Sequence, residues 1–435
     1  MSDLFLRFDV EDWLTPAADW ALEHILDELE RVGARANFAV VGLKARALVE
    51  RGRTDLLQRM AHLGTVGFHS YSHSLHPTLA EELEPLAREE AESRFVDREG
   101  VGVRELLDGG VPPVFFTQPG ANWVPEVLER GPDLGLQAFI SESWNTYLHP
   151  TRTLYWYGRV LYWSPPVDVP KGLLFRLPAG AEDAVAQVAR ALADGGPAMV
   201  VTHPTELVTH YFWDQDNFGG GVTRSPLIAG PALPEVAWEA KLLGFRRYLE
   251  GLHALRPRYV TVSDWLAAVR PAGPVEIDRA TLHEALAAHG LDALFTGDNW
   301  LSAAEAVLAA ALLAESPGGA VRVPRLLAPS GTIADTDAAA ALLEKVRRDG
   351  RLPERVGEWH ISAWAPRFLA RTLGVAAALR FTERVRPARD QHWDWPIFPP
   401  GFTAERLLEE SRRQAWTLKP AILAGAPERG TASPR

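Results

Sequence analysis

Cysteine is absent from the 435 residues. The absence excludes a disulfide framework, a thiolate metal site and a cysteine nucleophile. Basic charge is also scarce: 45 Lys and Arg residues face 56 Asp and Glu residues, which leaves a formal net charge of -11. An acidic chain without a basic block is not typical of a nucleic-acid binder or of a protein that adheres to anionic membranes.

Long hydrophobic runs are missing as well. No run reaches the 18 apolar residues of a membrane-spanning helix, and the alanine-rich stretch 303–314 is too short and contains Glu305. At the start of the chain, Asp3, Arg7 and Asp9 interrupt the apolar residues, so the charge and apolar pattern of a signal peptide is absent. The sequence therefore predicts a cytoplasmic protein.

Strand and helix signals alternate along the first 270 residues. Apolar residues at 22, 25, 26, 29 and 32 have helical spacing, so we predict a helix over 17–32 that ends at Gly33. Short apolar runs between such segments predict buried strands. Strands are expected at 4–8, 37–41, 66–68, 114–116, 137–140, 173–177, 198–202 and 259–262, and further helices at 43–62 and 81–107. This alternation predicts an α/β fold with mainly parallel strands, in a sheet or a barrel.

The composition changes at Pro271-Ala272-Gly273-Pro274. We predict a first domain over 1–272, a smaller and mostly helical domain over 273–426, and a disordered polar tail over 427–435. The second domain is expected to contain an alanine-rich helix that begins with the capping box Ser302-Ala303-Ala304-Glu305.

Three carboxylates, Asp9, Glu11 and Asp12, follow the first predicted strand. Such carboxylates repel one another unless a cation lies among them, although a solvated loop would also accommodate them. Two histidines, His69 and His73, follow the strand at 66–68. Four residues apart, they can face a single metal ion, and imidazole is a common zinc ligand; the alternative is a pair of structural histidines.

Two further polar clusters follow later strands. Residues 117–122, Thr-Gln-Pro-Gly-Ala-Asn, form a Pro-Gly turn whose backbone N–H groups could stabilise an oxyanion, or a plain turn before a helix. His203 ends the apolar run Val200-Val201-Thr202 and suits a general acid or base, or a structural role.

These four clusters, in this order, resemble the polysaccharide deacetylase family, the NodB homology domain of carbohydrate esterase family 4. His69-Ser70-Tyr71-Ser72-His73 matches the family's His-Ser/Thr-x-x-His motif in full, and residues 37–42 resemble the strand before it. The resemblance covers about residues 3 to 270. It implies a (β/α) barrel-like fold and metal-dependent removal of an N-acetyl group.

The resemblance also implies roles for single residues. His69 and His73 would be metal ligands, with a third ligand that is either Glu11 or Asp12, and we prefer Asp12 because Glu11 could face solvent. The metal would most plainly be Zn²⁺. Asp9 would be the general base, and His203 the general acid for the leaving amine.

The third motif departs from the family pattern. Thr117 or Gln118 stands where the family usually has an arginine that positions and tunes the base. The absence of this arginine leaves the pKa of Asp9 open and puts the usual polysaccharide substrates in question. A backbone N–H near Gly120 would help to hold the oxyanion.

Aromatic and acidic side chains are expected near the substrate. Residues 211–221 mix aromatic, acidic and glycine residues, and Trp213 and Asp214 within them could contact a sugar. Trp13 and Trp144 lie near predicted strand ends. The expected substrate is an N-acetylated sugar or glycoconjugate. Two alternative functions are a hydrolase of another C–N bond, such as a cyclic amide, and a non-catalytic glycan-binding protein.

The second domain lacks an acidic triad and a glycine-rich phosphate loop. Residues 350–356 and the helix after them resemble the pseudomurein-binding repeat of archaeal cell-wall proteins. We favour a helical cap that supports the first domain or forms a homodimer interface.

Overall fold

A computed structural model describes most of the chain. The described residues are 2–120, 122, 124–140, 154–156, 160–163, 168–169, 173–193, 198–271, 274–291, 294–296, 299–316, 318–324, 326, 329–334, 339–377 and 398–423. The chain forms two compact units, each assembled from separate stretches of sequence. Unit 1 comprises Met1–Thr146, Trp163–Ala267 and Ala388–Leu407, and unit 2 comprises Tyr147–Tyr162, Ala268–Pro387 and Leu408–Arg435. The domain boundary near residue 272 stays a prediction, because compactness does not show which segments fold independently.

Unit 1 is built on a parallel sheet. Its strands run in the order β5-β4-β3-β2-β1-β9-β8, and β10 also pairs with β1. All these pairings are parallel. The strands are β1 (Asp3–Val10), β2 (Ala36–Val40), β3 (Gly64–Phe68), β4 (Phe115–Thr117), β5 (Ala138–Ile140), β8 (Asp168–Val169), β9 (Ala198–Thr202) and β10 (Arg258–Tyr259). The predicted α/β class with mainly parallel strands is confirmed.

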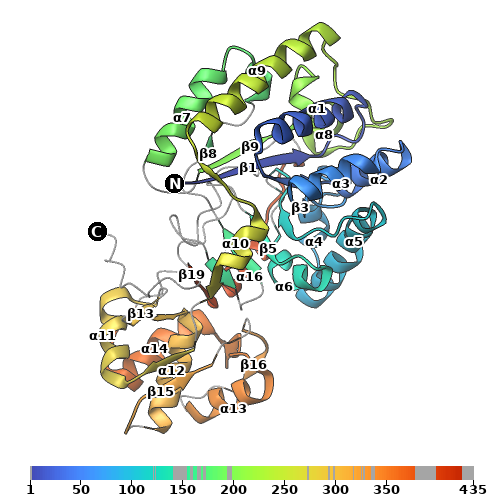
Figure 1. The fold of residues 1–435 in the computed structure, drawn as a ribbon. Coiled ribbons are helices and arrows are strands. Elements are labelled where there is room, and N and C mark those ends of the chain that lie inside the picture. Colours follow the sequence, from blue (N-terminus) through green and yellow to red (C-terminus); the bar gives the residue numbers. More distant parts are fainter. Residues whose placement is uncertain are drawn as a thin grey trace. The chain divides into compact units, whose positions relative to one another are not determined.

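Helices connect these strands and pack beside the sheet (Figure 1). They are α1 (Ala17–Val32), α2 (Gly42–Glu50), α3 (Thr54–Leu63), α4 (Leu79–Leu83), α5 (Arg88–Asp108), α6 (Glu126–Arg130), α7 (Ala181–Ala193), α8 (Asp214–Phe218), α9 (Glu235–Ala254) and α10 (Val262–Ala268). The predicted helix over 17–32 is confirmed. It ends where Gly33 adopts φ +66°, a left-handed conformation that glycine adopts without steric cost.

Three predicted elements differ from the structure. The helix expected over 43–62 is two helices, α2 and α3, separated at Gly52, whose φ is +70°. The helix expected over 81–107 is interrupted between α4 and α5, where Pro85 lacks the N–H that a continuous helix needs. The strand expected over 173–177 is a 3₁₀ turn, Leu174–Arg176.

Unit 2 combines helices with short strand pairs, which are antiparallel except for the parallel pair of β16 with β17. The alanine-rich helix α12 (Ala303–Glu315) begins with the predicted Ser302/Glu305 capping box and lies in the apolar core of the unit. Strand β12 (Val275–Ile277) pairs with β15 (Val321–Val323). The other helices are α11 (Arg279–His289), α13 (Ala339–Asp349), α14 (Ile361–Leu373) and α16 (Glu405–Ala415). The other strands are β6 (Leu154–Trp156), β7 (Val160–Trp163), β11 (Val269–Pro271), β13 (Leu294–Thr296), β14 (Asn299–Leu301), β16 (Thr332–Ile333), β17 (Arg355–Val356), β18 (Trp359–His360) and β19 (Leu418–Leu423).

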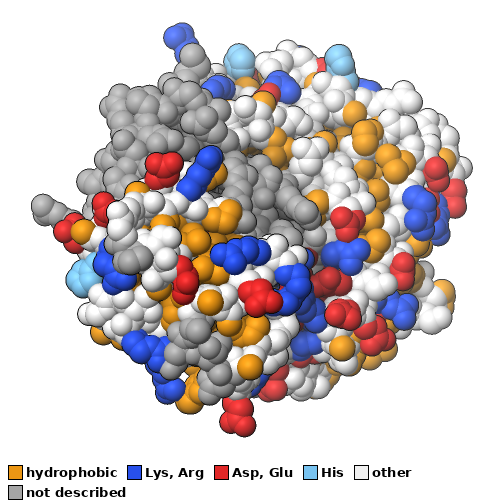
Figure 2. Space-filling view, turned by 90° about the horizontal axis from the view of Figure 1, so that it is seen from below, with side chains coloured by type: hydrophobic (Ala, Val, Ile, Leu, Met, Phe, Trp, Pro, Cys, Tyr) orange, Lys and Arg blue, Asp and Glu red, His pale blue; other side chains and the backbone are white. Residues whose placement is uncertain are grey.

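Acidic and basic side chains are intermixed on the face drawn in Figure 2, with apolar side chains among them. Within the described part of the chain, no helix has both the length and the apolar character needed to cross a membrane.

Candidate metal centre and active site

The polar residues predicted at strand ends lie at one edge of the unit 1 sheet. Asp9 and Glu11 flank the end of β1, His69 directly follows β3, and His203 directly follows β9. Strands β3, β2, β1 and β9 are successive parallel neighbours, so their carboxyl ends share that edge. In open α/β sheets this edge is where ligands bind.

Three buried side chains, Glu11, His69 and His73, converge there. One ligand atom of each lies within 4.8 Å of the ligand atoms of the other two. Glu11 Oε2 is 3.0 Å from His73 Nε2 and 3.7 Å from His69 Nε2. None of the three is more than 4% exposed. Metal–ligand bonds to histidine and carboxylate are about 2 Å long, so these separations suit a single ion between the three groups.

The second ring nitrogen of each histidine has a partner of its own. His69 Nδ1 is 2.9 Å from the carbonyl oxygen of Thr117, at the end of β4, and His73 Nδ1 is 2.8 Å from Ser74 Oγ. A metal-binding imidazole usually donates its other N–H to such an oxygen, which fixes the ring and its tautomer. The two Nε2 atoms are therefore oriented toward Glu11 as ligands would be.

The turn that carries both histidines is held by a buried acid. Ser70 and His73 have φ values of +64° and +50°, which non-glycine residues adopt at a cost of order 1 kcal/mol each. Glu99 of α5 is fully buried and accepts hydrogen bonds from the Tyr71 N–H (3.0 Å) and from Ser70 Oγ (3.3 Å). Burial raises the pKa of Glu99 to about 7, although Arg98 opposes that rise. Glu99 thus stabilises a strained turn that places the two ligands.

Glu11 is held by an indole. Trp213 is fully buried, and its Nε1 donates to Glu11 Oε1 at 3.4 Å. Burial raises the pKa of Glu11, but the charges of His73 and His203 and hydrogen bonds from the histidines outweigh that effect and hold the pKa well below its usual range. Glu11 is therefore an ionised carboxylate, as a metal ligand must be.

Asp12 faces a different set of partners. Its Oδ1 accepts hydrogen bonds from the Leu14 and Thr15 N–H groups at 3.0 and 2.9 Å, and its Oδ2 accepts one from Thr205 Oγ1 at 2.7 Å. Burial raises the pKa of Asp12 in spite of these hydrogen bonds. This is the geometry of an aspartate that stabilises a turn. The geometry therefore does not support the preference for Asp12 as third ligand, and it places Glu11 with the histidines instead.

Asp9 is paired with an arginine from its own strand. Arg7 Nε and Nη2 donate to Asp9 Oδ1 and Oδ2 at 2.8 and 2.6 Å, and both residues are 2% exposed. Asp9 Oδ2 also lies 4.0 Å from His69 Nε2 and 3.7 Å from His203 Nε2. Burial raises the pKa of Asp9, but Arg7 and His69 more than offset this, so the net shift is downward. Asp9 is ionised and can accept a proton.

His203 is oriented by a second buried acid. Its Nδ1 is 2.7 Å from Glu206 Oε1, while Glu206 Oε2 accepts a hydrogen bond from the Leu174 N–H at 2.9 Å. The Nε2 atom is thereby directed toward Asp9. Burial lowers the pKa of His203, but the negative charges of Glu11 and Glu206 raise it to about 9. A protonated His203 can donate a proton from Nε2.

Two of the tryptophans expected near the substrate are buried in the structure. Trp213 is fully buried and Trp13 is 9% exposed, and their rings pack edge to face with centroids 4.4 Å apart. Neither ring offers a free face to a sugar, so this burial does not support the expectation that the two tryptophans lie at the substrate. Trp144 lies outside the described residues.

Two other predicted site residues are described. Gly120 is exposed, with φ +50°, and its carbonyl oxygen accepts a hydrogen bond from Gln118 Nε2 at 3.1 Å. Asp214 begins α8. Burial raises its pKa to about 6, and the charge of His73 opposes the rise, which places Asp214 within electrostatic range of the metal-site candidates. The roles of both residues stay predictions.

Sequence reasoning missed Arg7 and Glu206. Arg7 had a detectable signal: a charged side chain inside an apolar strand is rarely buried unless it is paired, and Asp9 follows two residues later on the same face of the strand. Glu206 lies three residues after His203, within reach across one turn. These residues supply the basic partner of Asp9 and the acidic partner of His203.

No protein-family model matches the chain, and no curated protein matches it. Among solved structures, it is similar to a putative polysaccharide deacetylase from Mycobacterium smegmatis, with 14% identity and a TM-score of 0.38 over 61% of this chain and 89% of that one. It is also similar to the Xyl-CE4 domain of a xylanase from the hindgut metagenome of Trinervitermes trinervoides, with 14% identity and a TM-score of 0.33 over 61% and 90%. A third is a family 4 acetyl xylan esterase from Clostridium thermocellum, solved with a cobalt ion, with 14% identity and a TM-score of 0.34 over 61% and 91%. Similarity this weak leaves the function to be argued from the chain's own residues.

Proposed function

We propose that this chain is a divalent-metal-dependent hydrolase that removes an N-acetyl group from an amino sugar or glycoconjugate. The observation that carries the proposal is the convergence of Glu11, His69 and His73 beside Asp9 and His203. Three ligands with an adjacent base and an adjacent acid form the arrangement that amide hydrolysis requires.

The donor set fits a divalent ion, and Zn²⁺ first of all. Two imidazole nitrogens and one carboxylate are ligands that zinc prefers, and three protein ligands leave a position for water and substrate. A bound ion would polarise the acyl carbonyl and acidify the attacking water.

The remaining roles belong to residues of this chain. Asp9, kept ionised by Arg7, takes the proton from the attacking water. His203, kept protonated by Glu206, gives its Nε2 proton to the departing nitrogen, since an amine leaves poorly as its anion. The Gly120 N–H is a candidate donor to the oxyanion, and Asp214 a candidate contact for the sugar.

The proposal is tested by acetate release. Protein purified without chelator is analysed for bound metal and then assayed with a panel of acetylated amino sugars and with cyclic amides. We expect about one equivalent of metal and acetate release from at least one amino sugar. Hydrolysis of cyclic amides alone would favour the other C–N hydrolase, and protein with neither metal nor activity would contradict both enzyme proposals.

Arg7 is expected to act as a positioning residue. Replacing Arg7 with methionine should lower kcat about 10²-fold with unchanged metal content, because Asp9 loses its bidentate partner and its alignment. The pKa of Asp9 should also rise. Because the base works only when ionised, the acidic limb of the pH–kcat profile should then move to higher pH.

Arg258→Met is the matched control for this variant. Arg258 of β10 forms a bidentate pair with Asp3 of β1, the strand that also carries Arg7, but it does so at the protein surface. The Arg258→Met substitution should leave kcat and the pH profile unchanged. An Arg7→Met protein with normal kcat, or with an unmoved acidic limb, would show that Arg7 does not position the base.

A further inference from the structure

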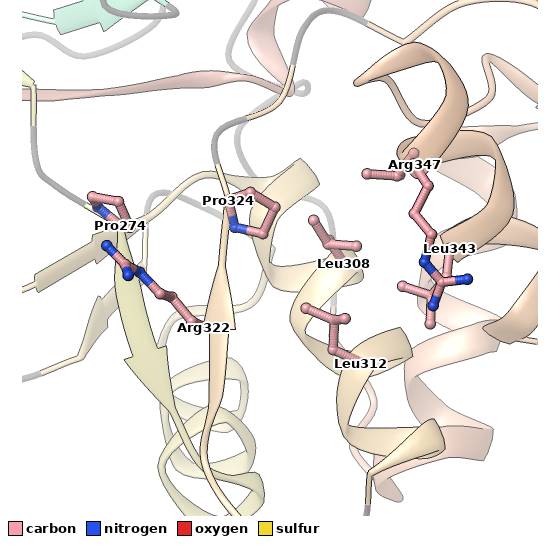
Figure 3. A pocket seen from close by; sticks show the side chains of 8 residues that line it. Pro274, Leu308, Leu312, Arg322, Pro324, Leu343 and Arg347 are labelled. Carbon is pink, nitrogen blue, oxygen red and sulfur yellow. The ribbon is translucent and has the colours of Figure 1, made fainter.

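Unit 2 contains a pocket of about 540 Å³ that no part of the hydrolysis proposal uses. Leu308 and Leu312 of α12 form one side, and Leu343 and Val346 of α13 form another. Figure 3 shows Pro324, at the end of β15, facing these residues. The volume is within the range of about 300–1,000 Å³ that is typical of small-molecule sites.

The apolar lining follows from the character of α12. Apart from Glu305, this helix consists of alanine, leucine and valine until its final glutamate, and nearly all of it is buried. A helix that is apolar on all sides needs cover on all sides. Leu312 near its end is only partly buried, so the apolar surface continues into the pocket.

Two arginines are the charged residues of the pocket lining. Arg322 of β15 and Arg347 of α13 come from opposite walls, and both are exposed (Figure 3). Within the described residues, neither guanidinium forms a salt bridge, and Glu276, opposite Arg322 in the β12–β15 ladder, is not within ion-pair distance. By contrast, the adjacent Arg348 pairs with Asp349.

We propose that this pocket binds an amphipathic anion, namely an aliphatic carboxylate. Its hydrocarbon chain would lie against the leucines, where burial of apolar area supplies affinity. Its carboxylate would pair with Arg322 or Arg347, since a guanidinium binds a carboxylate through two parallel hydrogen bonds. In a chain of net charge -11, two cations without described acidic partners beside an apolar pocket favour an anionic ligand over a neutral one. This site is independent of the proposed hydrolase function.

Titration calorimetry of the full chain with decanoate, at concentrations below micelle formation, tests the proposal. Decanoate should bind to the wild type, and decanol should bind at least about tenfold more weakly, because a charge-assisted hydrogen bond contributes about that factor. The Arg322→Ala/Arg347→Ala double variant should bind decanoate about as weakly as decanol. Arg348→Ala, which changes the neighbouring arginine outside the lining, should bind decanoate as the wild type does.

A second variant tests whether the apolar lining of the pocket binds the hydrocarbon chain. Val346→Trp places a large ring in the pocket from a partly exposed helix position and should abolish binding of both ligands, with an unchanged melting temperature in the absence of ligand. Equal affinity for decanol and decanoate would overturn the proposal. So would full decanoate binding by the double arginine variant, or no decanoate binding by the wild type.

Discussion

Replacing Glu11 with glutamine should remove the bound divalent metal and lower acetate release by about 10³-fold or more. The neutral amide keeps the size of the side chain but loses the charge that a dication requires. A Lewis acid contributes several kcal/mol to such a reaction, and each 1.4 kcal/mol is a factor of ten in rate. The measurements are elemental analysis after dialysis and kcat/KM on the best acetylated amino sugar.

Asp12→Asn is the control for this variant, because the two carboxylates are adjacent in sequence. Asp12 bonds to backbone N–H groups and to Thr205, so its replacement should cost about 1 kcal/mol of stability and leave the metal content unchanged. Loss of metal from Asp12→Asn together with full occupancy in Glu11→Gln would reverse the assignment of the third ligand.

Replacing His203 with glutamine should lower kcat by about 10² to 10⁴-fold while the metal content stays normal. Glutamine can still form hydrogen bonds, but it cannot donate a proton to the leaving nitrogen. The effect should depend on the leaving group: activated esters, which need no proton on departure, should lose much less. Equal losses on amides and activated esters would show that His203 is not the general acid.

The Glu206→Gln variant tests the same general acid through its pKa, without removing the imidazole. Removing this negative charge lowers the pKa of His203, which its acidic neighbours hold near 9, and a bound dication that offsets Glu11 lowers it further. A general acid works only when protonated, so activity is present below its pKa and is lost as the pH rises through it. The alkaline limb of the pH–kcat profile should therefore move to lower pH in Glu206→Gln, and an unmoved limb would contradict this role.

Arg7 and Glu206, the partners of Asp9 and His203, show why a motif can look incomplete in a sequence. The arginine expected in the third motif is missing there, yet Asp9 has a buried bidentate arginine partner two residues earlier, on its own strand. Likewise His203 has its acid three residues later. A strand places side chains i and i+2 on one face, so a partner from the same strand can occupy the space that a distant loop would otherwise fill.

The sequence by itself determined the α/β class, because apolar periodicity and short buried runs are local properties that report directly on burial. It also singled out Asp9, Glu11, Asp12, His69, His73 and His203 as candidate residues for the site, since they lie shortly after apolar runs, but it preferred Asp12 to Glu11 as the third ligand. Element ends were less certain: one proline and one glycine divided two helices that periodicity alone left continuous.

Only the tertiary structure decided which polar groups meet. Glu11 and Asp12 are neighbours in sequence, and their different partners come from the turn after β3, from the turn after β9 and from Trp213, all distant along the chain. The same holds for the tryptophans: their positions in the sequence suggested contact with a sugar, whereas the fold buries Trp13 and Trp213 and packs their rings against each other. The direction of a side chain depends on what packs around it, and that packing is settled only when distant segments come together.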